Sequence, residues 1–303
     1  MDVDDVQACP PRDTAIAIEE RALAFDCAGA RLYGILSRPA ADATQPPAAA
    51  RGVLVVVGGP QYRAGSHRQF TLLARSLAAD GIAVMRFDYR GMGDSEGATR
   101  AFDSVGDDLR AAIDAFMGAA PEVREVVLWG LCDAASAIGM YAAQDPRVTG
   151  LVLLNPWVRT EDGLARATLR HYYRARLREP DFWKNLVRGR WNWRASLSSL
   201  LALTRSATRA GVGSSATGSG TSLPDRMHAG LRDFGGRVLL VTAGADLTAR
   251  EFCDLADTNE HWQRLLSPPR VTRRQIDAAD HTFSRREWRD QVARWTAEWL
   301  RSW

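Results

Sequence analysis

Apolar residues along the chain fall mainly into short continuous runs that end in glycine, proline or polar residues. Runs of this length without polar interruption are typical of buried parallel strands, which are covered on both faces. Two further segments flank Gly29 and predict an antiparallel pair. The predicted strands are residues 23–27, 31–36, 52–57, 82–87, 125–129, 148–154, 237–242 and 271–276.

Between these strands the apolar residues recur every three or four positions, which indicates helices with one buried face. The predicted helices are residues 69–79, 105–116, 133–143 and 288–299, with Val105, Leu109, Ile113 and Phe116 on one face and Trp288, Val292, Trp295 and Trp299 on another. Strands that alternate with helices predict an α/β fold, in which a mostly parallel sheet carries helices on both faces.

One long segment breaks this alternation. Residues 157–209 are helical in character and rich in arginine and tryptophan, and residues 210–222 consist largely of Gly, Ser, Ala and Thr, which predicts a flexible stretch. We interpret residues 157–234 as a helical cap inserted between two parts of a core, 22–156 and 235–303. Residues 1–20 are predicted to be a loose leader.

Composition narrows the function classes without naming one. The 303 residues, 46% hydrophobic and 25% charged, suffice for one large α/β domain with an insertion. A net charge of +3 gives no reason to expect a nucleic-acid partner. The four cysteines have no zinc-binding spacing and there is no Walker sequence, so we expect neither a metal nor a cofactor.

The N-terminal residues are acidic and lack an apolar stretch, so we expect no signal peptide. No window of about 18 apolar residues predicts a membrane-spanning helix. The expected location is the cytoplasm, where thiols stay reduced.

The strongest chemical signal surrounds Cys132. An apolar strand runs into Gly130-Leu131-Cys132-Asp133-Ala134, and a small-residue helix follows. This is the layout of a nucleophile elbow, a tight strand-to-helix turn that holds one reactive side chain over the edge of a sheet. Cysteine replaces the usual serine, and alanine the usual last glycine. The competing interpretations are a buried structural thiol at Cys132 and a nucleophile at Ser136.

Two partners for Cys132 follow later strands. Asp246 comes after the strand 237–242 and His281 after the strand 271–276. Since active sites in parallel sheets form at the carboxyl ends of strands, we expect Cys132, His281 and Asp246 to meet there as nucleophile, base and acid. Asp246 has an alternative role as a helix cap, with Asp280 as the substitute acid.

An oxyanion formed by attack on a carbonyl needs N–H donors. We expect them from the backbone of Asp133 and from the loop 58–61. Pro60 has no N–H, so if Pro60 lies nearest the carbonyl, Gln61 must donate instead. Gly59, Tyr62, His67 and Trp157 are candidates for lining the substrate pocket.

The order of these motifs resembles the α/β-hydrolase superfamily over residues 22–303, apart from the cap. That resemblance implies an eight-stranded, mostly parallel sheet. More narrowly, residues 129–137, Gly58-Gly59-Pro60-Gln61-Tyr62-Arg63, 244–249 and 279–283 resemble the family called exosortase A system-associated hydrolase 1. Its members are encoded beside bacterial exopolysaccharide and protein-sorting machinery, which implies such a setting here but specifies no substrate.

Three functions remain open at this point. The first is hydrolysis of a small-molecule or carrier-bound ester or thioester through a cysteinyl acyl-enzyme. The second is acyl transfer, since the G-x-C-x core also resembles polyhydroxyalkanoate synthases. The third is a non-catalytic binding module. The arginine-rich cap is a solvated face, an attractor for an anionic acyl substrate, or a contact to the inner membrane surface. The oligomeric state stays open.

Overall fold

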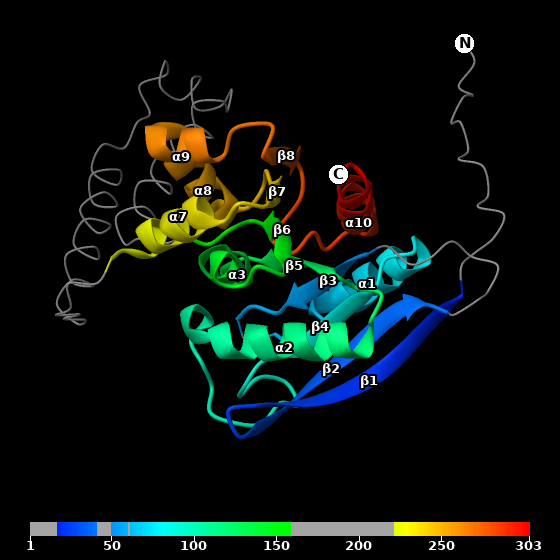
Figure 1. The fold of residues 1–303 in the computed structure, drawn as a ribbon. Coiled ribbons are helices and arrows are strands. Elements are labelled where there is room, and N and C mark those ends of the chain that lie inside the picture. Colours follow the sequence, from blue (N-terminus) through cyan, green and yellow to red (C-terminus); the bar gives the residue numbers. More distant parts are fainter. Residues whose placement is uncertain (1–16, 41–49, 60, 159–220) are drawn as a thin grey trace, which may run out of the picture.

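A single twisted sheet of eight strands organises the part of the chain that the structure describes (Figure 1). The structure is a computed structural model, and it describes residues 17–40, 50–59, 61–158 and 221–303. The strand order is β1-β2-β4-β3-β5-β6-β7-β8. β2 is antiparallel to β1 and β4, and the strands from β4 onward along this order are parallel. The strands are β1 (Ile18–Cys27), β2 (Ala30–Pro39), β3 (Arg51–Val56), β4 (Val84–Asp88), β5 (Glu125–Leu131), β6 (Val148–Leu154), β7 (Arg237–Ala243) and β8 (Val271–Ile276).

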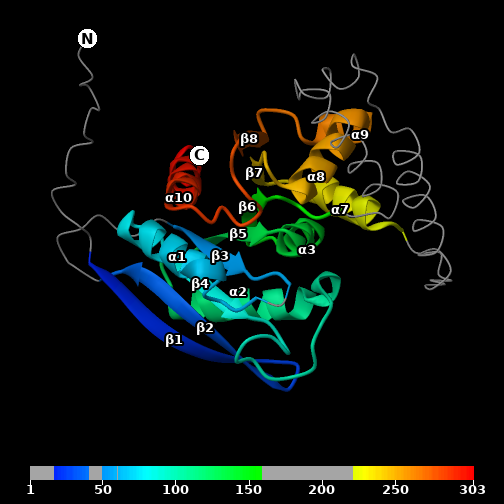
Figure 2. The same ribbon diagram turned by 180° about the vertical axis from the view of Figure 1, so that it is seen from behind.

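Helices cover both faces of the sheet, as Figures 1 and 2 show from opposite sides. α1 and α10 bury their apolar residues against one face, while α2, α3, α7, α8 and α9 contribute to the core on the other. The helices are α1 (Gln69–Ala79), α2 (Gly106–Ala119), α3 (Asp133–Tyr141), α7 (Leu223–Asp233), α8 (Leu247–Thr258), α9 (Glu260–Leu265) and α10 (Arg286–Arg301). No helix in the described ranges combines the length and hydrophobicity that a membrane crossing requires.

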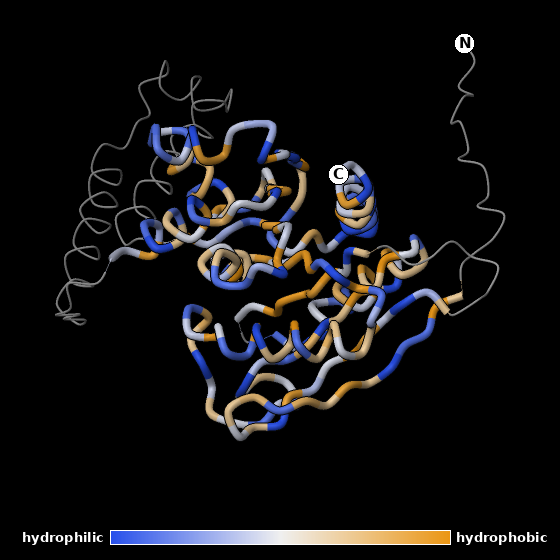
Figure 3. The backbone as a smooth tube through the Cα atoms, in the orientation of Figure 1, coloured by the Kyte–Doolittle hydropathy of each residue, from blue (hydrophilic) through white to orange (hydrophobic). Residues whose placement is uncertain are grey.

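The hydropathy pattern accounts for this arrangement. The central strands are strongly hydrophobic (Figure 3), and the side chains of β3 and β4 are almost wholly buried. Val105, Leu109, Ile113 and Phe116 are buried as their spacing predicted. The eight predicted strands all form, so the predicted α/β architecture is confirmed.

The first strand begins earlier than the sequence indicated. β1 starts at Ile18, which pairs with Pro39 of β2, so the last residues of the predicted leader belong to the sheet. The hydropathy pattern did not indicate this part of the strand, because its charged residues give no alternation of apolar and polar positions. Glu19 pairs instead with Arg38 across the two strands at 3.0 Å. Residues 1–16 lie outside the described residues.

The predicted cap falls mainly on residues 159–220, which are outside the described residues, so it stays a prediction. Helix α7, which lies at the end of the predicted cap range, is described and packs on α3. Gly139 and Gly230 allow this contact, since a Cβ on Gly230 would stand 2.4 Å from the carbonyl oxygen of Gly139. Ser222 caps α7 by accepting the N–H of Asp225 at 3.3 Å.

β5 and α3 approach each other so closely that only glycine fits at position 130. A Cβ there would lie 2.8 Å from the carbonyl carbon and 2.9 Å from the carbonyl oxygen of Ala134. These are backbone atoms and cannot move aside without displacing the helix. Gly130 therefore fixes where α3 begins, and with it the position of Cys132.

We predict that Gly130→Ala destabilises the protein by about 1–3 kcal/mol or more, because the added methyl group overlaps the first turn of α3. Urea unfolding followed by circular dichroism measures this. Gly118→Ala is the matched control: Gly118 lies in α2 with open space around it, and should gain about 0.5–1 kcal/mol from helix propensity. Equal effects of the two substitutions would contradict the packing argument.

Candidate active site

Cys132 occupies a strained turn between β5 and α3. Its backbone has φ 61° and ψ −122°, a left-handed φ that costs a non-glycine residue about 1–3 kcal/mol. Backbone hydrogen bonds hold it there: the N–H of Cys132 donates to the carbonyl of Leu154 at 2.9 Å, and its carbonyl accepts from Ser136 and Trp157 at 3.3 Å each. The side chain is half-buried. The predicted elbow is therefore present in the backbone geometry.

His281 and Asp246 meet Cys132 at this edge of the sheet. Nδ1 of His281 lies 2.8 Å from Oδ2 of Asp246, and the Cys132 side chain is close enough to the imidazole to help raise its pKa. Asp246 also caps α8, since its carboxylate accepts the N–H groups of Thr248 at 3.3 Å and Ala249 at 3.0 Å. Asp246 therefore both contacts His281 and caps α8, so its carboxylate is held by two elements.

The titration of the pair follows from these contacts. Hydrogen bonds with Asp246 and Cys132 raise the pKa of His281 to about 10, although desolvation lowers it. Burial alone would raise the pKa of Asp246, but His281 and the capping N–H groups bring it below its usual value. The arrangement therefore favours an imidazolium between a carboxylate and a sulfur at neutral pH.

Asn155 is a positioning residue that the sequence did not reveal. It follows β6 with φ 42°. Its side-chain amide donates to the carbonyl of His281 at 2.8 Å and accepts the N–H of Ala243 at 2.8 Å. It thereby joins the histidine loop to the end of β7, from which Asp246 follows. Its position directly after a parallel strand is a signal in the sequence, but an uncharged amide does not qualify as the acid of a triad.

The predicted oxyanion region shows an unexpected occupant. The carboxylate of Asp133 accepts the N–H of Gly59 at 2.7 Å and that of Ala134 at 2.9 Å. Asp133 thus holds the turn after β3 against the start of α3. We expected its backbone N–H to serve as an oxyanion donor, but its carboxylate also accepts the N–H of Gly59, which lies in the loop expected to supply the second donor. Oε1 of Gln61 is buried without a partner in the described residues. Pro60 lies outside them.

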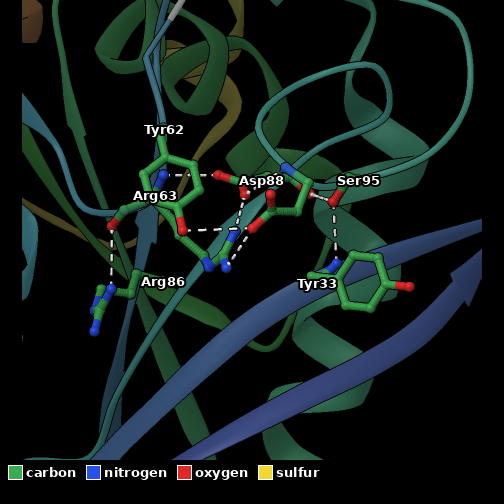
Figure 4. Close-up of polar contacts among 7 residues, drawn as sticks. Tyr33, Tyr62, Arg63, Arg86, Asp88 and Ser95 are labelled. Atoms are coloured by element: carbon green, nitrogen blue, oxygen red, sulfur yellow. Dashed lines mark hydrogen bonds and ion pairs between the residues drawn. The ribbon is translucent and has the colours of Figure 1, made fainter.

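A buried ion pair fixes the loop that follows (Figure 4). Asp88, the last residue of β4, has a fully buried side chain that pairs with the Arg63 guanidinium and accepts the Arg63 backbone N–H at 2.7 Å. Arg63 also pairs with Asp94 at 2.7 Å. Ser95 donates to the Asp88 carbonyl at 2.6 Å and accepts the N–H of Tyr33 at 3.0 Å. These contacts tie the loops after β3 and β4 together.

The remaining sequence candidates have clear locations. Ser136 is fully buried and donates its hydroxyl to the carbonyl of Trp157 at 2.5 Å, which leaves the elbow to Cys132. Asp280 accepts the N–H of Ser284 at 2.9 Å and so holds its own loop.

The residues predicted to line the pocket differ in their contacts and exposure. Trp157 adjoins the elbow through its N–H, and its ring lies 5.4 Å from that of Phe102. Tyr62 is exposed and directs its hydroxyl to Asp94 at 3.4 Å, and His67 is an exposed residue of a short 3₁₀ turn. In the described ranges no group of three or more His, Cys, Asp or Glu side chains is placed to hold a metal ion.

Comparison with known proteins agrees with the fold. A family model described as Hydrolase_4, serine aminopeptidase S33, matches residues 48–195. Solved structures match over nearly the whole chain. The protein has the α/β-hydrolase fold. The family description names a serine enzyme, whereas this chain has Cys132 at the bend. The comparison with curated proteins gives no match.

Three of the similar structures illustrate the likeness. An esterase from Pyrococcus furiosus is 15% identical, with 94% of this chain and 93% of that chain covered and a TM-score of 0.61. An α/β hydrolase from Penicillium is 17% identical, covering 93% and 98%, with a TM-score of 0.57. An α/β serine hydrolase from Xanthomonas campestris is 20% identical, covering 94% and 97%, at 0.50. At these identities the likeness concerns the fold alone.

The raised pKa of His281 predicts a pH-dependent stability. The folded protein holds this proton more tightly than the unfolded chain, so the stabilisation is complete below the ordinary value of 6.5 and is lost as the pH rises through about 10. We predict that the melting temperatures of the wild type and His281→Gln differ most below pH 6.5 and converge toward pH 10.

Thermal unfolding across this range measures the difference, and His261→Gln, at an exposed histidine of α9, is the control. A wild-type advantage that grows from neutral to alkaline pH contradicts the assignment.

Proposed function

We propose that this protein hydrolyses an ester or thioester through a cysteinyl acyl-enzyme formed on Cys132. The observation that carries the proposal is the meeting of Cys132, His281 and Asp246 at the carboxyl ends of three parallel strands, with the sulfur on a strained turn. The α/β-hydrolase fold and the match to a hydrolase family support it. We further propose that its acyl substrate belongs to a bacterial exopolysaccharide system, which the motif resemblance to exosortase-associated hydrolases supports.

The chemistry follows from the roles of the three groups. Cys132 attacks the acyl carbon as a thiolate while His281 holds the thiol proton, and the carbonyl electron pair moves onto oxygen. When the tetrahedral species collapses, the C–O or C–S bond to the leaving group breaks, and the leaving group takes the proton from His281. Water then adds to the thioester with His281 as base, which releases the acid and restores the thiol. Asp246 orients the imidazole and stabilises its charge throughout.

Acyl transfer to an alcohol or amine is the second candidate function. A cysteinyl thioester passes its acyl group readily to such nucleophiles, and the chemistry differs only in which molecule replaces water. The observation that favours acyl transfer is the cysteine at the bend, because it would give a thioester intermediate where the matching family, described as a serine enzyme, would give an ester. A non-catalytic binding module is the third, and the paired His281 and Asp246 argue against it.

We predict that the wild type incubated with a nitrophenyl ester or an acyl-CoA forms an acyl adduct on Cys132, detected by peptide mass spectrometry. Cys132→Ala should form none. His281→Ala should accumulate any adduct it forms, because deacylation also needs the base. Cys253→Ala is the matched control, since Cys253 is another half-buried free thiol, and its adduct on Cys132 should be unchanged.

The outcomes separate the three functions. Product formed without an acceptor supports hydrolysis, and product formed only with an added alcohol or amine supports acyl transfer. Absence of an adduct with every donor, or an adduct on another residue, would overturn the cysteinyl mechanism and favour the binding module.

A further inference from the structure

The carboxylate of Asp133 lies among the backbone donors that an oxyanion would use. Oδ2 accepts the N–H of Gly59 at 2.7 Å, and Oδ1 accepts that of Ala134 at 2.9 Å. Gly59 comes from the turn after β3 and Asp133 directly follows the nucleophile, so these are the two sides from which an α/β-hydrolase supplies its oxyanion donors.

The surrounding residues are shaped to admit this side chain. A Cβ on Gly58 would stand 2.0 Å from Oδ1 of Asp133, so only glycine leaves room for the carboxylate at that point. The next residue, Pro60, has no N–H to offer in place of that of Gly59. On the β3 side, the N–H donor of Gly59 is therefore already engaged by the carboxylate.

The charge of Asp133 opposes the reaction at this position. An ionised carboxylate beside Cys132 repels both the attacking thiolate and the oxyanion, in a site where water screens poorly. His281 from the loop after β8 and Tyr89 after β4 interact electrostatically with this carboxylate, and Cys132 precedes it in the chain. His281 attracts the carboxylate, but the triad needs that same positive charge.

A neutral Asp133 would have the opposite effect. The protonated carboxyl keeps one oxygen to accept the N–H of Gly59 and gains an O–H that can donate to the oxyanion. Burial raises the pKa of Asp133 above its ordinary value, although the N–H groups of Gly59 and Ala134 and the charge of His281 lower it, so burial favours the neutral form.

We propose that Asp133 is a charge gate of the oxyanion hole: ionised, it occupies the N–H donors and repels the oxyanion, and neutral, it supports it. This inference rests on the proposed function and adds a regulation of the same site by pH. It makes Asp133 a group that touches the reacting oxygen. Acylation of Cys132 should therefore fall as the pH rises through the pKa of Asp133.

Asp133→Asn tests the gate, because asparagine keeps one acceptor oxygen for Gly59 and offers a permanent donor to the oxyanion, at the cost of the bond that Ala134 donates to the other carboxylate oxygen. The probe is a trifluoromethyl ketone, to which the Cys132 sulfur adds reversibly: an S–C bond forms, the carbonyl pair moves onto oxygen, and nothing leaves. Fluorine NMR measures its affinity. We expect Asp133→Asn to bind it about tenfold or more tightly than the wild type near pH 8, with the difference shrinking as the pH falls and the wild-type carboxylate takes up its proton.

Asp107→Asn is the matched control, since Asp107 is also an aspartate in the first turn of a helix, α2, and is exposed. It should behave as the wild type does, and melting temperatures verify that each variant folds.

The possible results separate the gate from the triad. An adduct whose affinity and pH dependence are the same in the wild type and Asp133→Asn would overturn the gate and leave the proposed function intact. Weaker binding by Asp133→Asn at every pH would also overturn it, because the ionised carboxylate would then be a support for the loop. Absence of any adduct on Cys132 in both proteins would overturn the proposed function, and the gate with it.

Discussion

The left-handed turn at Cys132 is the constraint on which the site depends. A cysteine at φ 61° is unfavourable on its own, and it persists because β5 is pinned between β3 and β6 while α3 starts against Gly130. Packing of apolar side chains on both faces of the sheet offsets the strain of this turn. Its consequence is geometric: the sulfur stands over the strand ends instead of pointing into the core.

Around this turn, each loop at the strand ends is fixed by one polar side chain that spans two elements. Asn155 joins the histidine loop to β7, Asp246 joins His281 to the start of α8, and Asp88 joins the loops after β3 and β4. These bonds are buried or half-buried, so water competes poorly for them. These hydrogen bonds thereby hold together a site assembled from distant parts of the chain.

The sequence was sufficient for the strands and for the tight turn at Cys132, because these depend on local patterns: apolar runs, helical spacing and a glycine two residues before Cys132. The roles of Cys132, His281 and Asp246 as a catalytic triad stay a prediction. The sequence was insufficient where contacts join distant residues. Nothing near Asn155 indicates that its amide reaches His281, and nothing near Asp133 indicates that its carboxylate reaches Gly59 across the gap that Gly58 leaves. The charged edge of β1 escaped prediction because its stability comes from pairing with β2.

The central claim is that His281 and Asp246 activate the sulfur of Cys132, and the rate of alkylation tests it most directly. Iodoacetamide is added near neutral pH, and modification of Cys132, Cys27 and Cys253 is followed by mass spectrometry. Burial raises the pKa of the Cys253 and Cys27 thiols, so both are slow internal references. The account predicts that Cys132 reacts fastest and that His281→Gln slows it about tenfold or more. A Cys132 that reacts no faster than Cys253, or at the same rate in His281→Gln, would contradict it.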